Sequence, residues 1–269
     1  MDTSDQFQLL YKVKKFIKKF STKENDRNLQ ELYLSPNSEL GVFFLNSLMK
    51  KKINIFESLI TILKDVLYSL RYINHKIFAP VNLPKYKNIV VTWALKKDFK
   101  DDGSFVDRYL NVRSINLKNI LWIVIYMDKK TPKKLKDNIV LFNPIEKISF
   151  NFLPILNLII RNIFTLFTSP KLYMFSISNN NFFSNIFAKE TKKFFHKNIN
   201  KIIIPYEGQP FQNKLIQTIS KKFKRVETIG YIHSPPMSMP ANLIYRSTSP
   251  QKIILNGKDQ IHCFTRHLG

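Results

Sequence analysis

Two short polar segments of this chain carry side chains suited to acid–base chemistry. The first is PYEGQP at residues 205–210, where Tyr206, Glu207 and Gln209 surround Gly208. A carboxylate such as Glu207 could accept a proton or bind sugar hydroxyls. Gly208 permits a tight turn, because glycine adopts backbone angles that other residues avoid. The alternative is that Glu207 only caps the helix that follows.

The second segment is GYIHSPP at residues 230–236, which holds His233 and Ser234. His233 could act as a general base or donate a hydrogen bond to a phosphate, since its ordinary pKa lies near neutral pH. The alternative is a structural histidine whose ring bonds a backbone carbonyl at the edge of a sheet.

A series of strands and helices positions both segments. Residues 201–206 and 226–233 are predicted strands, residues 209–222 a helix between them, and residues 252–256 a further strand. Strands that alternate with helices indicate a parallel sheet, in which ligands bind beyond the carboxyl ends of the strands. The two polar segments both lie at such ends, so we expect them to face one cleft.

A third polar segment follows a predicted strand at 89–94. It spans residues 101–109 and places Asp107 beside Arg108. The two side chains could orient a ligand or form a structural ion pair, and the structural interpretation is slightly favoured.

The remaining elements complete an α/β fold. Continuous apolar runs at 120–127 and 139–142 indicate buried parallel strands, and we expect helices on both faces of the sheet. Residues 152–167 are predicted to form a buried helix, with an interfacial helix on a membrane as the alternative. The N-terminal region is predicted to be mainly helical and shows no signal-peptide pattern. The other predicted helices cover residues 7–20, 53–72, 181–196 and 258–269.

Several classes of site are disfavoured by the sequence. There are 6 glycines, and neither the dinucleotide fingerprint nor the P-loop motif occurs. The single cysteine, Cys263, excludes an internal disulfide and a cysteine zinc site. His262 and His267 do not share a helical face, so no metal site is predicted. No G-x-S-x-G nucleophile motif occurs either.

The formal net charge of +24 has three interpretations. Lys, Asn, Ile and Phe are all abundant, as in chains from A/T-rich genomes, so codon bias alone could raise the charge. A basic surface could also bind an anionic membrane. Nucleic acid is the least favoured partner, because no nucleic-acid-binding motif accompanies the charge.

Five segments occur in an order that resembles a known family. They are IVVTWALKKDFKDDGSFVDRYL (89–110), ILWIVIYM (120–127), IPYEGQPFQNKLIQ (204–217), GYIHSPPMSMPANLIY (230–245) and KIILNG (252–257). Together they resemble bacterial surface-carbohydrate biosynthesis proteins, which are similar to glycosyltransferases of the two-Rossmann GT-B type. The resemblance covers about residues 88–269.

The resemblance implies a Rossmann-like, acceptor-side domain over residues 85–269, preceded by the helical region 1–84. It implies catalytic roles for His233 and Glu207, and substrate binding by Tyr206, Gln209, Ser234, Asp107 and Arg108. In GT-B proteins a second, C-terminal domain holds the donor. This sequence is expected to be truncated before such a domain, which puts the activity of the chain alone in doubt.

The function expected from the resemblance is transfer of a sugar from a nucleotide donor to a glycan or lipid-linked acceptor. No cofactor is expected, since the nucleotide sugar is itself the substrate. The expected location is cytoplasmic, with a peripheral position on the inner face of the cell membrane as an alternative. A non-catalytic acceptor-binding or scaffold subunit of the same pathway, or an inactive fragment, is the alternative function.

Overall fold

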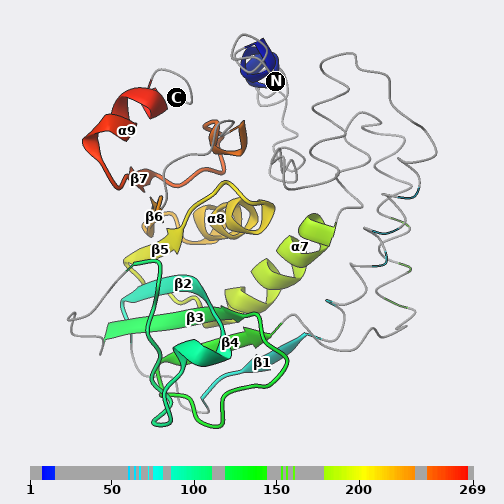
Figure 1. Ribbon diagram of the computed structural model, residues 1–269, viewed down its shortest axis with the longest axis vertical. Coiled ribbons are helices and arrows are strands. Elements are labelled where there is room, and N and C mark those ends of the chain that lie inside the picture. The colour runs from blue at the N-terminus through cyan, green and yellow to red at the C-terminus, as the bar shows by residue number, and fades with distance from the viewer. Residues whose placement is uncertain are drawn as a thin grey trace.

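The computed structural model describes residues 8–15, 75–80, 86–110, 119–143, 179–233 and 241–265, with single positions at 60, 64, 67, 72, 153, 156 and 160. Residues 8–15 are helical, and Figure 1 shows the other elements. In chain order they are β1 (Lys76–Phe78), β2 (Asn88–Ala94), η2 (Lys96–Asp98), β3 (Ile120–Tyr126), β4 (Ile139–Asn143), α7 (Asn179–Thr191), η5 (Lys192–Phe194), β5 (Lys201–Pro205), α8 (Pro210–Lys222), β6 (Glu227–Tyr231), η6 (Ala241–Leu243), β7 (Lys252–Ile254) and α9 (Lys258–Cys263).

The strands form one seven-stranded sheet in the order β1-β4-β3-β2-β5-β6-β7. Every neighbouring pair from β4 to β7 is parallel, and β1 pairs antiparallel with β4 at the edge. The parallel part of the sheet starts in the middle at β2 and continues outward through β3 to β4. The chain then returns to the middle and adds β5, β6 and β7 on the other side of β2. This is the strand order of a doubly wound, Rossmann-like sheet. In such a sheet the order in which strands are added reverses between the first and fourth parallel strands, here β2 and β5.

The central strands are continuous apolar runs, as expected of parallel strands covered on both faces. β3 (ILWIVIY) and β4 (IVLFN) are buried along almost their whole length. Residues that alternate along each strand enter two different cores. In β3, Ile123 and Ile125 face one core, while Trp122 and Val124 face the other.

Helices α7 and α8 cover the first face of the sheet, and Figure 1 shows both helices on the same side. Residues Phe211, Leu215 and Ile219 of α8 repeat every four positions and so form one buried stripe. The helix begins at Pro210, where the missing N–H costs nothing. Lys221 and Lys222 in the last turn interact favourably with the negative end of the helix dipole. Phe183 and Phe187 of α7 join the same aromatic core.

The second face is covered by loops in the part of the chain that the structure describes. Phe99, Phe105, Leu110 and Leu135, from the segments after β2 and β3, pack against the core residues of β2–β4. The expectation of helices on both faces is therefore met on one face only among these residues. The alternation of strands and helices predicts a parallel sheet. It does not predict that side chains of the loops after β2 and β3 cover the second face.

The predicted strands and helices in the described ranges are present, with ends shifted by a few residues. Strand β1 was not predicted, because three residues are too few to show a period. β1 therefore joins the sheet from within the region 1–84, which was predicted to be mainly helical. Residues 53–72 and 152–167 lie almost wholly outside the described residues. In the second segment Leu153, Leu156 and Ile160 are helical and exposed, so the predicted burial is wrong at these three positions. Apolar periodicity shows a helix but not whether anything covers it.

Among the residues described here, no helix combines the length and apolar character needed to cross a membrane.

Tyr86 should make the stability of the fold fall at alkaline pH. Its side chain is 4% exposed, its hydroxyl donates to the carbonyl of Phe194, and burial raises its pKa to about 12. In an unfolded chain the pKa is about 10. The unfolded state therefore releases this proton first, and stability present below pH ~10 is lost as the pH rises toward 12, by about 2 kcal/mol.

Urea unfolding at pH 8, 10 and 11 should show a smaller alkaline loss for Tyr86→Phe than for the wild type. Tyr11→Phe is the matched control, because Tyr11 is 68% exposed, and it should retain the wild-type slope. Identical slopes for all three proteins would show that Tyr86 does not contribute.

Candidate functional site

The sheet opens at the point where its strand order reverses. β2 pairs with β3 over all seven of its residues, from Asn88 to Ala94. With β5 it pairs only over Asn88–Val90, whereas β5 pairs with β6 as far as Pro205. The carboxyl halves of β2 and β5 therefore separate, and doubly wound sheets bind ligands in the crevice that such a reversal creates.

A pocket of about 420 Å³ lies at this opening. This volume is within the ordinary range of small-molecule sites. Its walls come from the ends of three strands, β2, β3 and β5, and from the segment after β2. The lining residues are Trp93, Ala94, Leu95, Asp98, Arg108, Tyr109, Met127, Glu207 and Gln209.

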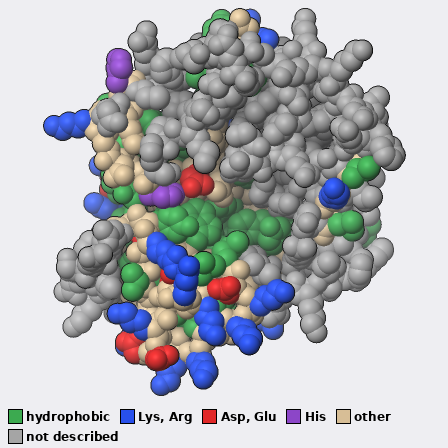
Figure 2. Space-filling model, viewed as in Figure 1, with side chains coloured by type: hydrophobic (Ala, Val, Ile, Leu, Met, Phe, Trp, Pro, Cys, Tyr) green, Lys and Arg blue, Asp and Glu red, His purple; other side chains and the backbone are tan. Residues whose placement is uncertain are grey.

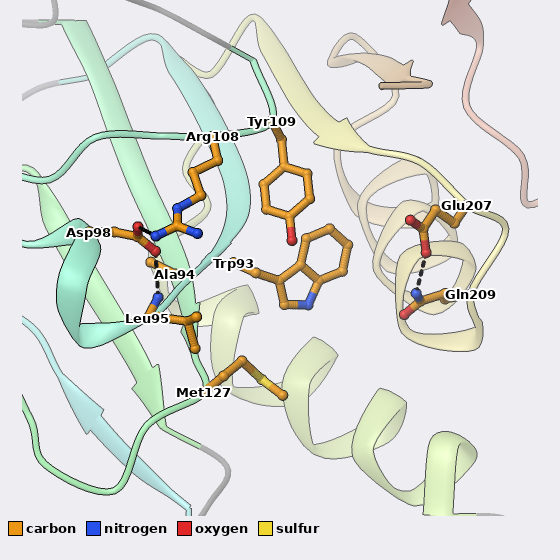
Figure 3. Close-up of a pocket in the computed structure, with 9 residues that line it drawn as sticks. All are labelled: Trp93, Ala94, Leu95, Asp98, Arg108, Tyr109, Met127, Glu207 and Gln209. Carbon is orange, nitrogen blue, oxygen red and sulfur yellow. Dashed lines mark hydrogen bonds and ion pairs between the residues drawn. The ribbon is translucent and has the colours of Figure 1, made fainter. Parts of the chain in front are cut away.

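The pocket has two polar ends and an aromatic middle. In Figure 3, Arg108 and Asp98 lie on one side, Glu207 and Gln209 on the other, and the rings of Tyr109 and Trp93 between them. Figure 2 shows hydrophobic side chains gathered in the middle of the same face, with Lys and Arg side chains crowded below them. An aromatic floor between polar groups suits a ring that carries hydroxyls.

Buried amides hold the backbone around Glu207. Gln212 in the first turn of α8 is 0% exposed, and its side-chain oxygen accepts hydrogen bonds from the backbone N–H groups of Glu207 and Gln209, at 3.0 and 2.9 Å. Its amide nitrogen donates to the carbonyl of Pro205 at 2.6 Å. Asn242, from a distant segment, donates to the carbonyl of Glu207. The turn is therefore fixed from two directions.

Both carboxylate oxygens of Glu207 face a polar neighbour. The side-chain amide of Gln209 donates to Oε2 at 2.7 Å, and Nε2 of His233 lies 3.8 Å from Oε1. The Glu207 side chain remains 40% exposed. The residue at the N-cap of α8 is Gln209, so Glu207 does not have the capping role that was the structural alternative. A fixed carboxylate at the wall of a pocket can accept a proton from a bound hydroxyl.

His233 lies beside Glu207 and is not among the described residues that line the pocket. Its ring packs edge-to-face on Tyr109, with centroids 4.8 Å apart. Its Nδ1 is buried and has no hydrogen-bond partner among the described residues. Burial, followed by the charge of Glu207, raises the pKa of Tyr109. Because His233 lies 3.8 Å from the carboxylate of Glu207 and does not line the pocket, it is closer to Glu207 than to a ligand in the pocket.

Arg108 forms an ion pair with Asp98 at the other end of the pocket. The Asp98 side chain is 5% exposed and also accepts a hydrogen bond from the backbone N–H of Leu95, at 2.7 Å. The Arg108 side chain is 45% exposed. The sequence paired Arg108 with its neighbour Asp107, whereas the structure pairs it with Asp98.

Tyr206 and Asp107, two other predicted site residues, do not line the pocket. Tyr206 is 1% exposed, and its hydroxyl lies 2.9 Å from Oδ1 of Asn213 and 3.3 Å from Oγ of Ser249. Asp107 is buried and accepts hydrogen bonds from Thr92 Oγ1 and the backbone N–H of Leu110, both at 2.5 Å. Both side chains are buried, and their bonding partners do not line the pocket. Ser234 lies outside the described residues.

The bond from Thr92 to Asp107 should be important for stability. Thr92 is 0% exposed, so Thr92→Val keeps the shape of the side chain but leaves a buried carboxylate without this donor. We expect a loss of about 1–3 kcal/mol in the free energy of unfolding, measured by urea titration. Thr218→Val is the control, because the Thr218 hydroxyl only bonds the carbonyl of Lys214 in its own helix. Equal losses in both variants would contradict the role of Asp107.

Six lining residues escaped the sequence analysis: Trp93, Ala94, Leu95, Asp98, Tyr109 and Met127. Trp93 is the second-last residue of the apolar strand β2 and is indistinguishable there from a core residue. It does contact Phe211 of α8, with ring centroids 5.5 Å apart. Met127 follows β3 directly, so its position after a predicted strand was the available signal. Tyr109 stands beside Arg108, the residue that the pattern did select.

The described residues contain no group of three His, Cys, Asp or Glu side chains that could share a metal ion. No protein-family model, curated protein or solved structure matches this chain.

Proposed function

We propose that this protein is a glycosyltransferase-like enzyme of surface-polysaccharide biosynthesis, whose Rossmann-like domain binds the glycan acceptor in the pocket between β2 and β5. The observation that carries the proposal is the position of Glu207. Its carboxylate is held by Gln209, backed by His233, and exposed on a pocket with an aromatic floor. This arrangement combines a proton acceptor with a surface for a sugar ring.

The proposed reaction is a substitution at the anomeric carbon of a nucleotide sugar. A hydroxyl oxygen of the acceptor forms the new bond to that carbon, and the bond to the nucleotide diphosphate breaks with its electron pair. Glu207 takes the proton of the hydroxyl, while His233 stabilises and orients the carboxylate. Gln209 fixes the second carboxylate oxygen, and Trp93 and Tyr109 hold the sugar ring.

The segment after β2 supports an acceptor role for this pocket. In dinucleotide-binding sheets a glycine-rich turn and a helix N-terminus follow the first parallel strand and bind the diphosphate. Here β2 is followed by Leu95 and the 3₁₀ helix η2, without a glycine. The proposal therefore assigns the nucleotide to another part of the assembled enzyme. In the GT-B arrangement that part is a second domain.

The partners under this proposal are a nucleotide sugar and a glycan or lipid-linked acceptor. A peripheral position on the inner face of the cell membrane belongs to the proposal, since Lys and Arg outnumber Asp and Glu by 43 to 19 and basic surfaces bind anionic leaflets.

A non-catalytic acceptor-binding subunit of the same pathway is the second candidate. It is favoured by one observation: His233 is not among the described residues that line the pocket. A binding subunit needs the polar and aromatic groups of the pocket but no acid–base pair.

Genetic complementation tests both candidates. Deleting the gene should reduce the surface polysaccharide of the source cell, and the wild-type chain in its natural reading frame should restore it. Glu207→Ala and His233→Ala should each fail to restore it. Full restoration by both variants would leave only the binding subunit. An unchanged polysaccharide after deletion would refute both candidates.

A further inference from the structure

The pocket between β2 and β5 presents a positive group and a negative group at opposite ends. Arg108 is 45% exposed at one end and Glu207 is 40% exposed at the other, with Trp93 and Tyr109 between them. We infer that the ligand is an acidic sugar, whose carboxylate or phosphate binds Arg108 while its reacting hydroxyl faces Glu207. This inference rests on the proposed function, because it names the substrate class of the same site.

The guanidinium of Arg108 is oriented before any ligand binds. Asp98 bonds it from the buried side, and Asp98 is itself fixed by the backbone N–H of Leu95. A guanidinium has five N–H donors in one plane, so a group held by one carboxylate can still donate to a second anion. This planar fork matches carboxylate and phosphate oxygens better than it matches a single hydroxyl.

The charge of Asp98 does not remove the preference for an anion. Its side chain is 5% exposed and its two oxygens already bond Arg108 and Leu95, whereas Arg108 reaches the pocket surface. The field of the whole chain, with a net charge of +24, also attracts anions.

The two ends of the pocket also fix the direction in which the ligand binds. An anionic substituent beside Glu207 would be repelled, and the same substituent beside Arg108 would be attracted. A hydroxyl can donate to the Glu207 carboxylate, which has acceptor capacity only. The ring between these groups lies against Trp93 and Tyr109, whose own rings are 5.4 Å apart between centroids. Reversing the ligand would therefore lose both polar contacts.

Matched pairs of sugars test the inference directly. Methyl glucuronide and methyl glucoside, both methyl glycosides, differ only at C6, which is a carboxylate in the first and a hydroxymethyl group in the second. Methyl galacturonide and methyl galactoside form a second pair. Titration followed by saturation-transfer NMR should show the wild type binding the acidic member about tenfold more tightly or better, because hydrogen bonds to charged groups are the stronger ones. Glucose 6-phosphate, compared with glucose, tests phosphate against carboxylate as the preferred anion.

Variants of Arg108 and Asp98 assign the preference to this ion pair. Arg108→Gln should bring the ratio of acidic to neutral affinity close to one, and Arg108→Lys should keep part of it. Because Arg108→Gln leaves Asp98 buried and uncompensated, the double variant Asp98→Asn, Arg108→Gln is measured beside it and should give the same ratio. Arg225→Gln, at an exposed arginine in the turn between α8 and β6, should retain the wild-type ratio.

Each outcome separates this inference from the proposed function. Equal affinity of the wild type for acidic and neutral sugars overturns the inference and leaves sugar binding intact. A preference that survives Arg108→Gln and the double variant also overturns it. Absence of binding to every sugar, acidic or neutral, overturns both.

Discussion

Replacing Glu207 by Gln is expected to lower the rate of sugar transfer by about 10²–10⁴-fold, the usual contribution of a positioned general base. The substitution keeps the size of the side chain and its hydrogen bonding to Gln209, but an amide cannot take the proton of the acceptor hydroxyl. Binding of the acceptor should change much less than the rate. The measurement is release of nucleoside diphosphate from a panel of nucleotide sugars in the presence of extracted glycan acceptor, for the natural full-length protein.

Glu227→Gln is the matched control for this experiment. Glu227 is the first residue of β6, whereas His233 follows the carboxyl end of that strand. Glu227 pairs with Lys201 and Lys252 at the amino ends of the strands, opposite the pocket. Its removal should leave the transfer rate within about twofold of the wild type, since it is far from the reacting groups. A rate for Glu207→Gln equal to that of the control would contradict a role for Glu207 in the chemistry and favour the binding subunit.

Gly208→Ala is expected to cost about 2–4 kcal/mol of stability and to displace Glu207. Gly208 has a φ of +68°, and a Cβ built there would lie 2.0 Å from the carbonyl oxygen of Asn242. Asn242 bonds the carbonyl of Glu207, so any movement that relieves the clash also moves the catalytic turn. Thermal unfolding measures the first effect, and acceptor affinity measures the second.

Gly257→Ala is the control for the glycine substitution. Gly257 has a φ of −156°, an extended conformation that alanine adopts without strain. This variant should unfold within a few degrees of the wild type, whereas Gly208→Ala should unfold about 5–10 °C lower. Normal stability of Gly208→Ala would mean that the segment around Asn242 can move away at little cost.

Much of the sheet was predictable because buried parallel strands consist of continuous runs of apolar residues. The runs at β2, β3 and β4, and the alternation of β5, α8 and β6, all have this form. The sequence predicted one cleft for the polar residues that follow β5 and β6, whereas the pocket lies between β2 and β5. What the pattern could not give is the order of strands, because side-chain periodicity does not state which strand lies next to which.

Individual roles within the site were harder to predict. Tyr206 stands one residue before Glu207, but the alternation of side chains along a strand sends it into the core towards Asn213. Asp98 and Arg108 are ten positions apart, and only the folding of the loop after β2 brings them together. His233 was predicted to face the same cleft as Glu207, but it is not among the residues that line the pocket, and its ring packs on Tyr109, more than a hundred residues away in the chain.

The two outer strands of the sheet bear on how this chain avoids aggregation. β1 and β7 each contain three residues and each begins with a lysine, Lys76 and Lys252. A short strand offers few free N–H and C=O groups to a second chain, and lysine is a residue that commonly disfavours pairing at sheet edges. Strand addition from another copy is therefore discouraged at both edges, even though the sheet between them is strongly apolar. If copies of this protein associate, we expect them to do so through side chains and not by extending the sheet.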